Sequence, residues 1–220
     1  MTRPAASEAG ARRTTERRND ILLLSSAAYL ILFYALTNYF PLRPPRTMPR
    51  FPFESGIGMF PSTCWIYLSY FIMLVFTGAR LRKLGWAPKA VGAIAAVVTM
   101  SGAVFLIYPT TILRPPIAGG GLSADLLRWV RALDPPNNCF PSLHVGLAFL
   151  CSMLLMRASR RTGMIVFVWA ILVAGSTLTT KQHYFLDIAG GLLVAGLGFA
   201  LFFAGPIGRS RSSAVPSSSA

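Results

Sequence analysis

Long apolar stretches separated by short polar segments set the pattern of this 220-residue chain. A stretch of about 20 apolar residues has the length that an α-helix needs to cross a bilayer. The pattern predicts six such helices, of which the fourth is short for the purpose. Their ranges are 21–40, 59–79, 90–108, 141–156, 163–180 and 185–206. We therefore predict an all-α, polytopic membrane protein folded as a six-helix bundle.

The two ends of the chain are polar. Residues 1–20 are rich in Arg, Ala and Thr, residues 208–220 are rich in Ser, and both segments are predicted to be disordered. The membrane domain then covers residues 21–207. Its first apolar run is too long for a signal-peptide core and lacks a clear cleavage site, so we predict that this helix is retained.

Composition excludes an ordinary soluble domain, because 54% of the residues are hydrophobic and only 13% are charged. The net charge of +14 does not indicate a nucleic-acid partner, since the basic residues lie between the apolar segments and not in one patch. Fourteen of the 21 Lys and Arg residues fall on the side of the membrane that holds the N-terminus. This bias predicts that both termini are cytoplasmic. The three cysteines, at positions 64, 139 and 151, have no spacing typical of a disulfide framework or zinc site.

The longest loop, residues 109–140, falls on the non-cytoplasmic side. Within it, Leu122, Leu126, Val130 and Leu133 recur at helical spacing. We predict a short helix there that lies at the membrane surface.

Ionisable side chains gather at the ends of several predicted spans. His183 and Asp187 are four residues apart, so a helix would place them on one face. A charge at the bilayer centre costs roughly 2.5–3.5 kcal/mol on insertion scales, which favours a function over simple contact between helices. His144 begins the fourth span, Arg114 follows the third and Ser176 ends the fifth. By the parity of the spans, all five residues fall at the same membrane face.

These residue types suit phosphoryl transfer. A phosphate monoester is a dianion, and Arg114 can bind it with two parallel hydrogen bonds. The hydroxyls of Ser142 and Ser176 can donate further hydrogen bonds to its oxygens. We therefore expect these three side chains to bind phosphate.

The two histidines fit complementary roles in such a reaction. A neutral His183 can attack phosphorus, and Asp187 can hold its ring in the required tautomer. His144, when protonated, can give its proton to the leaving oxygen. A haem carrier with His144 and His183 as axial ligands is an alternative. It would leave Arg114 and Asp187 without a purpose.

Three motifs occur in order along the chain: Arg114-Pro115, Pro141-Ser142-Leu143-His144, and Ser176 followed by His183 and Asp187. Together with the six-span order, they resemble the type 2 phosphatidic acid phosphatase superfamily over residues 55–205. The resemblance implies a phosphohistidine at His183, orientation by Asp187 and protonation of the leaving group by His144. It also implies phosphate binding by Arg114 and Ser142, a lipid phosphate substrate, and neither metal nor cofactor.

The motifs depart from the usual pattern of the family at three positions. Ile107 stands where the first motif usually has Lys, Leu143 replaces Gly in the second, and Thr177 replaces Arg in the third. Lys181, two residues before His183, is a candidate to replace one missing cation, although it could equally be an interfacial anchor.

The resemblance leaves more than one activity open. The first is hydrolysis of a lipid phosphomonoester or prenyl diphosphate, in a plasma or inner membrane with the active site facing outward. The motif variants are also similar to those of the inositol phosphorylceramide synthase branch, which predicts transfer of phosphate or a phospho-headgroup to a lipid hydroxyl instead. An inactive transporter or scaffold of the same fold is a further alternative.

Overall fold

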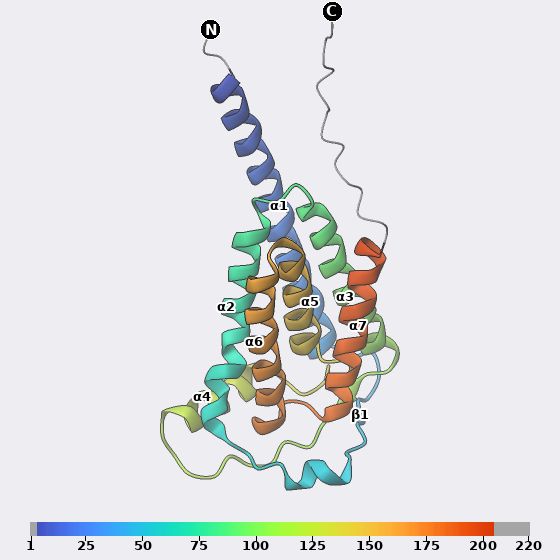
Figure 1. Ribbon diagram of the computed structural model, residues 1–220. Helices are drawn as coiled ribbons and strands as arrows, with labels where there is room; N and C mark the ends of the chain where they lie inside the picture. The colour runs from blue at the N-terminus through green and yellow to red at the C-terminus, as the bar shows by residue number, and fades with distance from the viewer. Residues whose placement is uncertain (1–3, 205–220) are drawn as a thin grey trace, which may run out of the picture.

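The structure is a computed structural model that describes residues 4–204, and it is mostly helical, as predicted. Besides its α-helices, the structure contains two short 3-10 helices, η1 (Pro52–Gly56) and η2 (Pro61–Thr63). It also contains a parallel pair of two-residue strands, β1 (Arg46–Thr47) and β2 (Thr110–Thr111). Figure 1 shows the arrangement. The seven α-helices are α1 (Pro4–Tyr39), α2 (Cys64–Leu81), α3 (Ala87–Ile107), α4 (Leu122–Leu133), α5 (Leu143–Ala158), α6 (Arg160–Thr179) and α7 (Phe185–Phe203).

Five helices in the described part of the chain are long and apolar enough to cross a membrane: α1, α2, α3, α6 and α7. The protein is therefore an integral membrane protein. The helix of the fourth predicted span, α5, has only 16 residues. The count of six crossings and the cytoplasmic placement of both termini accordingly remain predictions.

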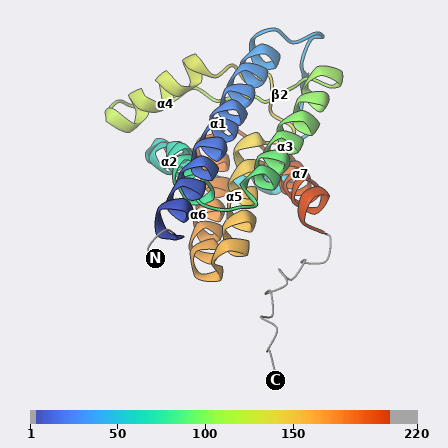
Figure 2. The ribbon, with the colours of Figure 1, turned by 90° about the horizontal axis from the view of Figure 1, so that it is seen from above.

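The short helix α5 forms the centre of the bundle (Figure 2). It packs against α2, α3, α6 and α7, and most of its side chains are buried. A helix that is apolar on all sides is stable in a protein core or in a membrane, and α5 lies in the core of the bundle. Gly146 of α5 lies against Gly191 of α7, where a side chain on either residue would meet backbone atoms of the other helix. This contact brings the start of α5 beside the start of α7.

The first helix begins well before the first apolar run. Residues 4–20, which the sequence led us to expect as disordered, continue into the same helix. Ala, Arg and Glu favour the helical state, and the ion pair between Arg12 and Glu16 joins successive turns. The Asp20 carboxylate also pairs with Arg82 at the start of the α2–α3 turn, at 2.8 Å. The predicted Ser-rich tail, residues 208–220, lies outside the described residues.

The helix predicted within residues 109–140 is present as α4, but its buried face differs from the expected one. Ala124, Leu127 and Val130 are buried, whereas Leu122 and Leu133 are exposed. The reason is that α4 packs against α2 and η2, and this contact selects the face. The location of α4 at a membrane surface remains a prediction.

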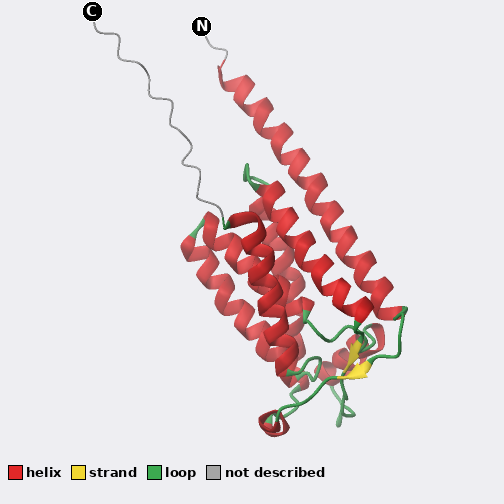
Figure 3. Cartoon of the chain, turned by 90° about the vertical axis from the view of Figure 1, so that its right-hand side faces the viewer, coloured by secondary structure: helices red, strands yellow, loops and turns green. Residues whose placement is uncertain are grey.

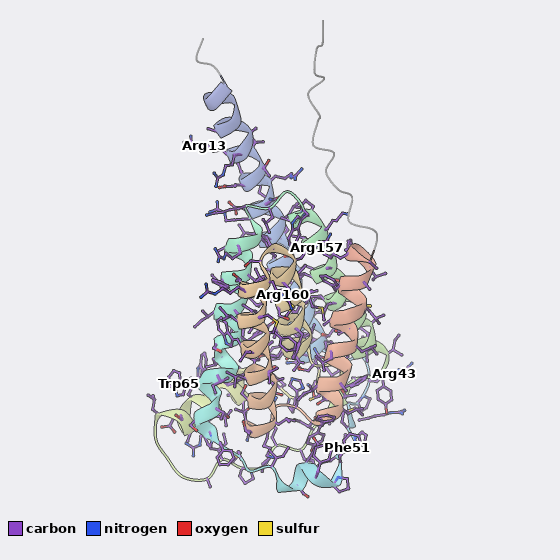
Figure 4. All side chains as sticks on the ribbon, in the orientation of Figure 1. Arg13, Arg43, Phe51, Trp65, Arg157 and Arg160 are labelled. Atoms are coloured by element: carbon purple, nitrogen blue, oxygen red, sulfur yellow. The ribbon has the colours of Figure 1, made fainter. Side chains whose placement is uncertain are left out.

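The two ends of the bundle differ in character. Both strands and the long loops lie at one end (Figure 3), where Figure 1 also places α4. Arg13 and Arg157 lie toward the other end, where α1 begins, while Arg43, Phe51 and Trp65 lie at the loop end (Figure 4). The turns at the loop end carry the candidate catalytic residues.

Candidate active site

The turn between α6 and α7 carries His183. Lys181 adopts a positive φ of 57°, and the backbone N–H groups of Gln182 and His183 both donate to the carbonyl of Thr177. These bonds fold the turn back on the end of α6. The turn therefore holds His183 in a fixed position, with only 8% of the residue exposed.

The carboxylate of Asp187 lies beside the His183 ring. The distance from Nδ1 of His183 to Oδ2 of Asp187 is 3.4 Å, and the same oxygen accepts a hydrogen bond from the Tyr184 N–H at 2.8 Å. Asp187 is fully buried. With Nδ1 facing the carboxylate, Nε2 on the opposite edge of the ring is the nitrogen available for chemistry.

The second histidine, His144, lies on the first turn of α5 between aromatic rings. Its ring centroid is 4.6 Å from that of Tyr67 and 4.7 Å from that of Tyr70, both on α2. The centroids of the His144 and His183 rings are 6.2 Å apart. The structure thus brings the two histidines of the chain to one place, although they are 39 positions apart in the sequence.

A polar cavity of about 640 Å³ lies beside His183. Three cationic side chains, those of Arg50, Arg114 and Lys181, border it together with Glu54. The ammonium of Lys181 donates to the carbonyl of Ile57 at 2.6 Å. Burial, with a further contribution from Arg50, lowers the pKa of Lys181. The cavity therefore offers concentrated positive charge next to an imidazole, which suits a phosphate group.

Asp134, at the end of α4, holds Arg114 in place. Nη1 of Arg114 donates to the Asp134 carbonyl at 2.6 Å, and Nη2 lies 3.7 Å from its carboxylate. Nε of Arg114 is buried and has no hydrogen-bond partner among residues 4–204. The guanidinium is thus fixed on one side, and the residue borders the cavity.

The sequence alone did not point to Arg131. In the structure its guanidinium donates to the carbonyls of Pro115 at 2.7 Å and Thr180 at 2.9 Å. These carbonyls adjoin Arg114 and Lys181 in the sequence. Burial, together with nearby Arg114, lowers the pKa of Arg131 to about 10, so the group remains charged at neutral pH. Arg131 therefore joins the two segments that carry the phosphate-binding candidates.

Glu54 was also missed by the sequence analysis. Its carboxylate accepts hydrogen bonds from the N–H of Phe51 at 2.6 Å and from the N–H of Phe185, the first residue of α7, at 2.7 Å. An isolated acidic residue in a loop gives little signal in a sequence. Its role follows only from the fold, which brings η1 against the start of α7.

The two predicted serines do not border the cavity. Ser142 is the N-cap of α5, where its hydroxyl accepts from the N–H of Val145 at 3.4 Å. Ser176 is buried, and its hydroxyl donates to the carbonyl of Val173 at 2.6 Å. Both hydroxyls make local bonds within their own helices, and binding of phosphate by Ser142 and Ser176 remains a prediction.

The acidic, Cys and His side chains in the described part of the chain form no group of three that could hold a metal ion. The buried Cys139 lies near the site, and burial, followed by the charge of Asp187, raises the pKa of its thiol. This thiol is not activated as a nucleophile.

Two histidines, one of them beside a buried carboxylate, thus lie at one end of an apolar helical bundle. A family model described as the PAP2 superfamily matches residues 9–201. The chain belongs to this superfamily, as the motifs predicted. Membership supports a phosphatase-type enzyme in a membrane. Comparisons with curated proteins and with solved structures found no significant match.

Proposed function

We propose that the protein hydrolyses a lipid phosphomonoester or a prenyl diphosphate through a phosphohistidine at His183. The observation that carries this proposal is the position of His183. Its Nδ1 faces the buried Asp187, while the residue borders the cavity that Arg114 and Lys181 also line. Nucleophile, orienting carboxylate and phosphate-binding cations thus meet at one place.

In the first step, Nε2 of His183 forms a bond to phosphorus and the bond from phosphorus to the ester oxygen breaks. The leaving oxygen keeps the electron pair and takes a proton from His144. In the second step, His144 accepts a proton from water as the water oxygen attacks phosphorus and the P–N bond breaks. A phosphomonoester thus gives an alcohol and inorganic phosphate. With a prenyl diphosphate, the bond that breaks joins the terminal phosphorus to the bridging oxygen, and the products are a prenyl monophosphate and inorganic phosphate. In both cases the two histidines return to their starting states.

The loop end of the bundle would lie on the non-cytoplasmic side under this proposal. The larger number of basic residues at the opposite end supports this orientation, because cytoplasmic segments carry the excess of Lys and Arg. The substrate phosphate would then be hydrolysed at the outer face of a plasma or inner membrane.

Phosphate release from a panel of lipid phosphates, measured with purified protein in nanodiscs, tests the activity. We expect His183→Ala to abolish release and Asp187→Asn to reduce it by about 10²–10⁴-fold. Asp125→Asn is a matched control, since Asp125 is an exposed carboxylate that pairs with Arg128 on α4. Near-normal turnover by His183→Ala would disprove the mechanism.

The same assay separates hydrolysis from transfer. A lipid labelled in its phosphate gives free labelled phosphate under the proposal. Labelled headgroup on a second lipid, without free phosphate, would show that a lipid hydroxyl replaces water as the acceptor. No activity from the wild-type protein on either readout would support an inactive scaffold.

A further inference from the structure

A second cavity, separate from the polar one, opens between α1 and α2. It has a volume of about 450 Å³ and is lined almost entirely by apolar side chains of α1, α2 and α4. This volume lies within the range of about 300–1,000 Å³ typical of small-molecule sites. We call it the α1–α2 groove.

The packing of the bundle explains why the groove exists. The helix α1 packs mainly against α3, whereas α2 packs against α5 and α6. The two helices are joined by the long segment of residues 40–63 and not by a tight turn. On α1 the groove extends from Ala27 to Tyr39, a distance of roughly 18 Å at 1.5 Å per residue.

His144 connects the groove with the proposed catalytic centre. Its side chain lines the groove, and its ring centroid is 6.2 Å from that of His183, which borders the polar cavity. Asp134 marks the same boundary. Its carboxylate accepts from Tyr34 and Asn38 on the groove side, at 2.7 and 2.9 Å, and lies 3.7 Å from Arg114 on the other.

We infer that the α1–α2 groove holds the hydrocarbon chain of the leaving group, with the ester oxygen at His144. This inference rests on the proposed function, in which His144 protonates that oxygen. A lipid phosphate needs a polar site for its phosphate, an apolar site for its chain, and the acid where the two meet. The two cavities and His144 have this arrangement.

The groove acts by orientation and not by affinity. A chain that leaves the bilayer for the groove exchanges one apolar environment for another, so it gains little hydrophobic free energy. Holding the chain fixes the ester oxygen relative to His144, and positioning of this kind acts on turnover. Blocking the groove should therefore lower kcat for lipid substrates more than it raises KM.

Two pairs of variants test the inference by turnover. Ala35→Trp and Leu74→Trp place an indole at residues that line the groove. Their controls, Ala28→Trp and Val75→Trp, change exposed residues of the same helices that do not line it. The measured quantity is kcat for a long-chain lipid phosphate divided by kcat for phenyl phosphate. We expect the lining variants to lower this ratio at least tenfold and the controls to keep it within twofold. Equal ratios in all four proteins would overturn the inference.

A binding experiment does not depend on turnover, so it distinguishes failure of the groove from failure of the proposed function. His183→Ala protein in nanodiscs is irradiated with a lipid phosphate that carries a diazirine on its terminal carbon. Adducts on groove residues of α1 and α2, reduced by excess unlabelled lipid phosphate but not by phosphatidylcholine, would support the inference. Adducts that phosphatidylcholine reduces equally would show bulk lipid in the groove. Adducts spread over exposed faces, or α1 residues cross-linked between two copies of the chain, would likewise overturn it.

Discussion

The contact between α5 and α7 gives the sharpest test of the fold around the site. A Cβ atom on Gly191 would lie 2.7 Å from the carbonyl oxygen of Ser142 and 3.1 Å from the nitrogen of Gly146. Both are backbone atoms of the facing helix segment, so no side-chain rotation can relieve the clash. Gly196, on the same helix, has no atom within 4 Å of an added Cβ. Gly191→Ala and Gly196→Ala are therefore the same chemical change in opposite environments.

The expected difference in the free energy of unfolding follows from what the two variants share and from what only one of them adds. Replacing glycine by alanine within a helix is favourable by about 1 kcal/mol, and this gain applies to both. Only Gly191→Ala adds the cost of overpacking, about 1–3 kcal/mol. The free energies of unfolding of the two variants should therefore differ by about 1–3 kcal/mol, with Gly191→Ala the less stable.

The same substitution should affect catalysis. To accept the methyl group, α5 and α7 must separate by several tenths of an ångström. The hydrogen bond from the Ser142 N–H to the Asp187 carbonyl, 3.0 Å long, crosses this contact. Because a misplacement of about 1 Å can cost 10²-fold in rate, we expect Gly191→Ala to lose roughly tenfold in kcat.

Unfolding titrations in detergent and phosphate release from the same preparations check both expectations. If the two variants unfolded at the same denaturant concentration and turned over at the same rate, α5 and α7 could not approach each other as described. Wild-type stability with lost turnover in Gly191→Ala alone would show that the methyl group displaces the site without weakening the bundle.

Three further variants test the surroundings of the polar cavity. Arg131→Gln should lower kcat/KM for phosphate esters at least tenfold because it unties the two cation-bearing segments. Arg43→Gln, which removes an exposed arginine at the same end of the bundle, should stay within twofold, and equal values for the two variants would refute the role of Arg131. Lys181→Arg should move the alkaline limb of the kcat/KM profile to higher pH. The lowered pKa of Lys181 means that its charge is lost at lower pH than that of an ordinary lysine, and an unchanged limb would exclude it from phosphate binding. Glu54→Gln should reduce kcat and the thermal midpoint together, since an amide accepts the Phe185 N–H less strongly than a carboxylate does; wild-type values for both would contradict this anchoring role.

Much of the site could be anticipated because its residues lie at helix ends. The four-residue spacing of His183 and Asp187 predicted a shared helical face, whereas the structure starts α7 only at Phe185 and places His183 in the preceding turn. The pair still meets, because Asp187 reaches back toward the turn as it accepts from the Tyr184 N–H. For Ser142 and Ser176 the sequence indicated the end of the bundle at which they lie, and the structure adds the local bonds that their hydroxyls make.

The sequence by itself determined the helical class, the long apolar helices and the clustering of ionisable groups at one end. Hydropathy and spacing report these properties directly, because each depends on residues close together in the chain. Only the tertiary structure decided which groups share a cavity. Arg131 turned inward, Glu54 reached the start of α7, and a groove remained between α1 and α2. These outcomes depend on which helices pack together, and contacts between residues far apart in the chain leave no periodic signal in a single sequence.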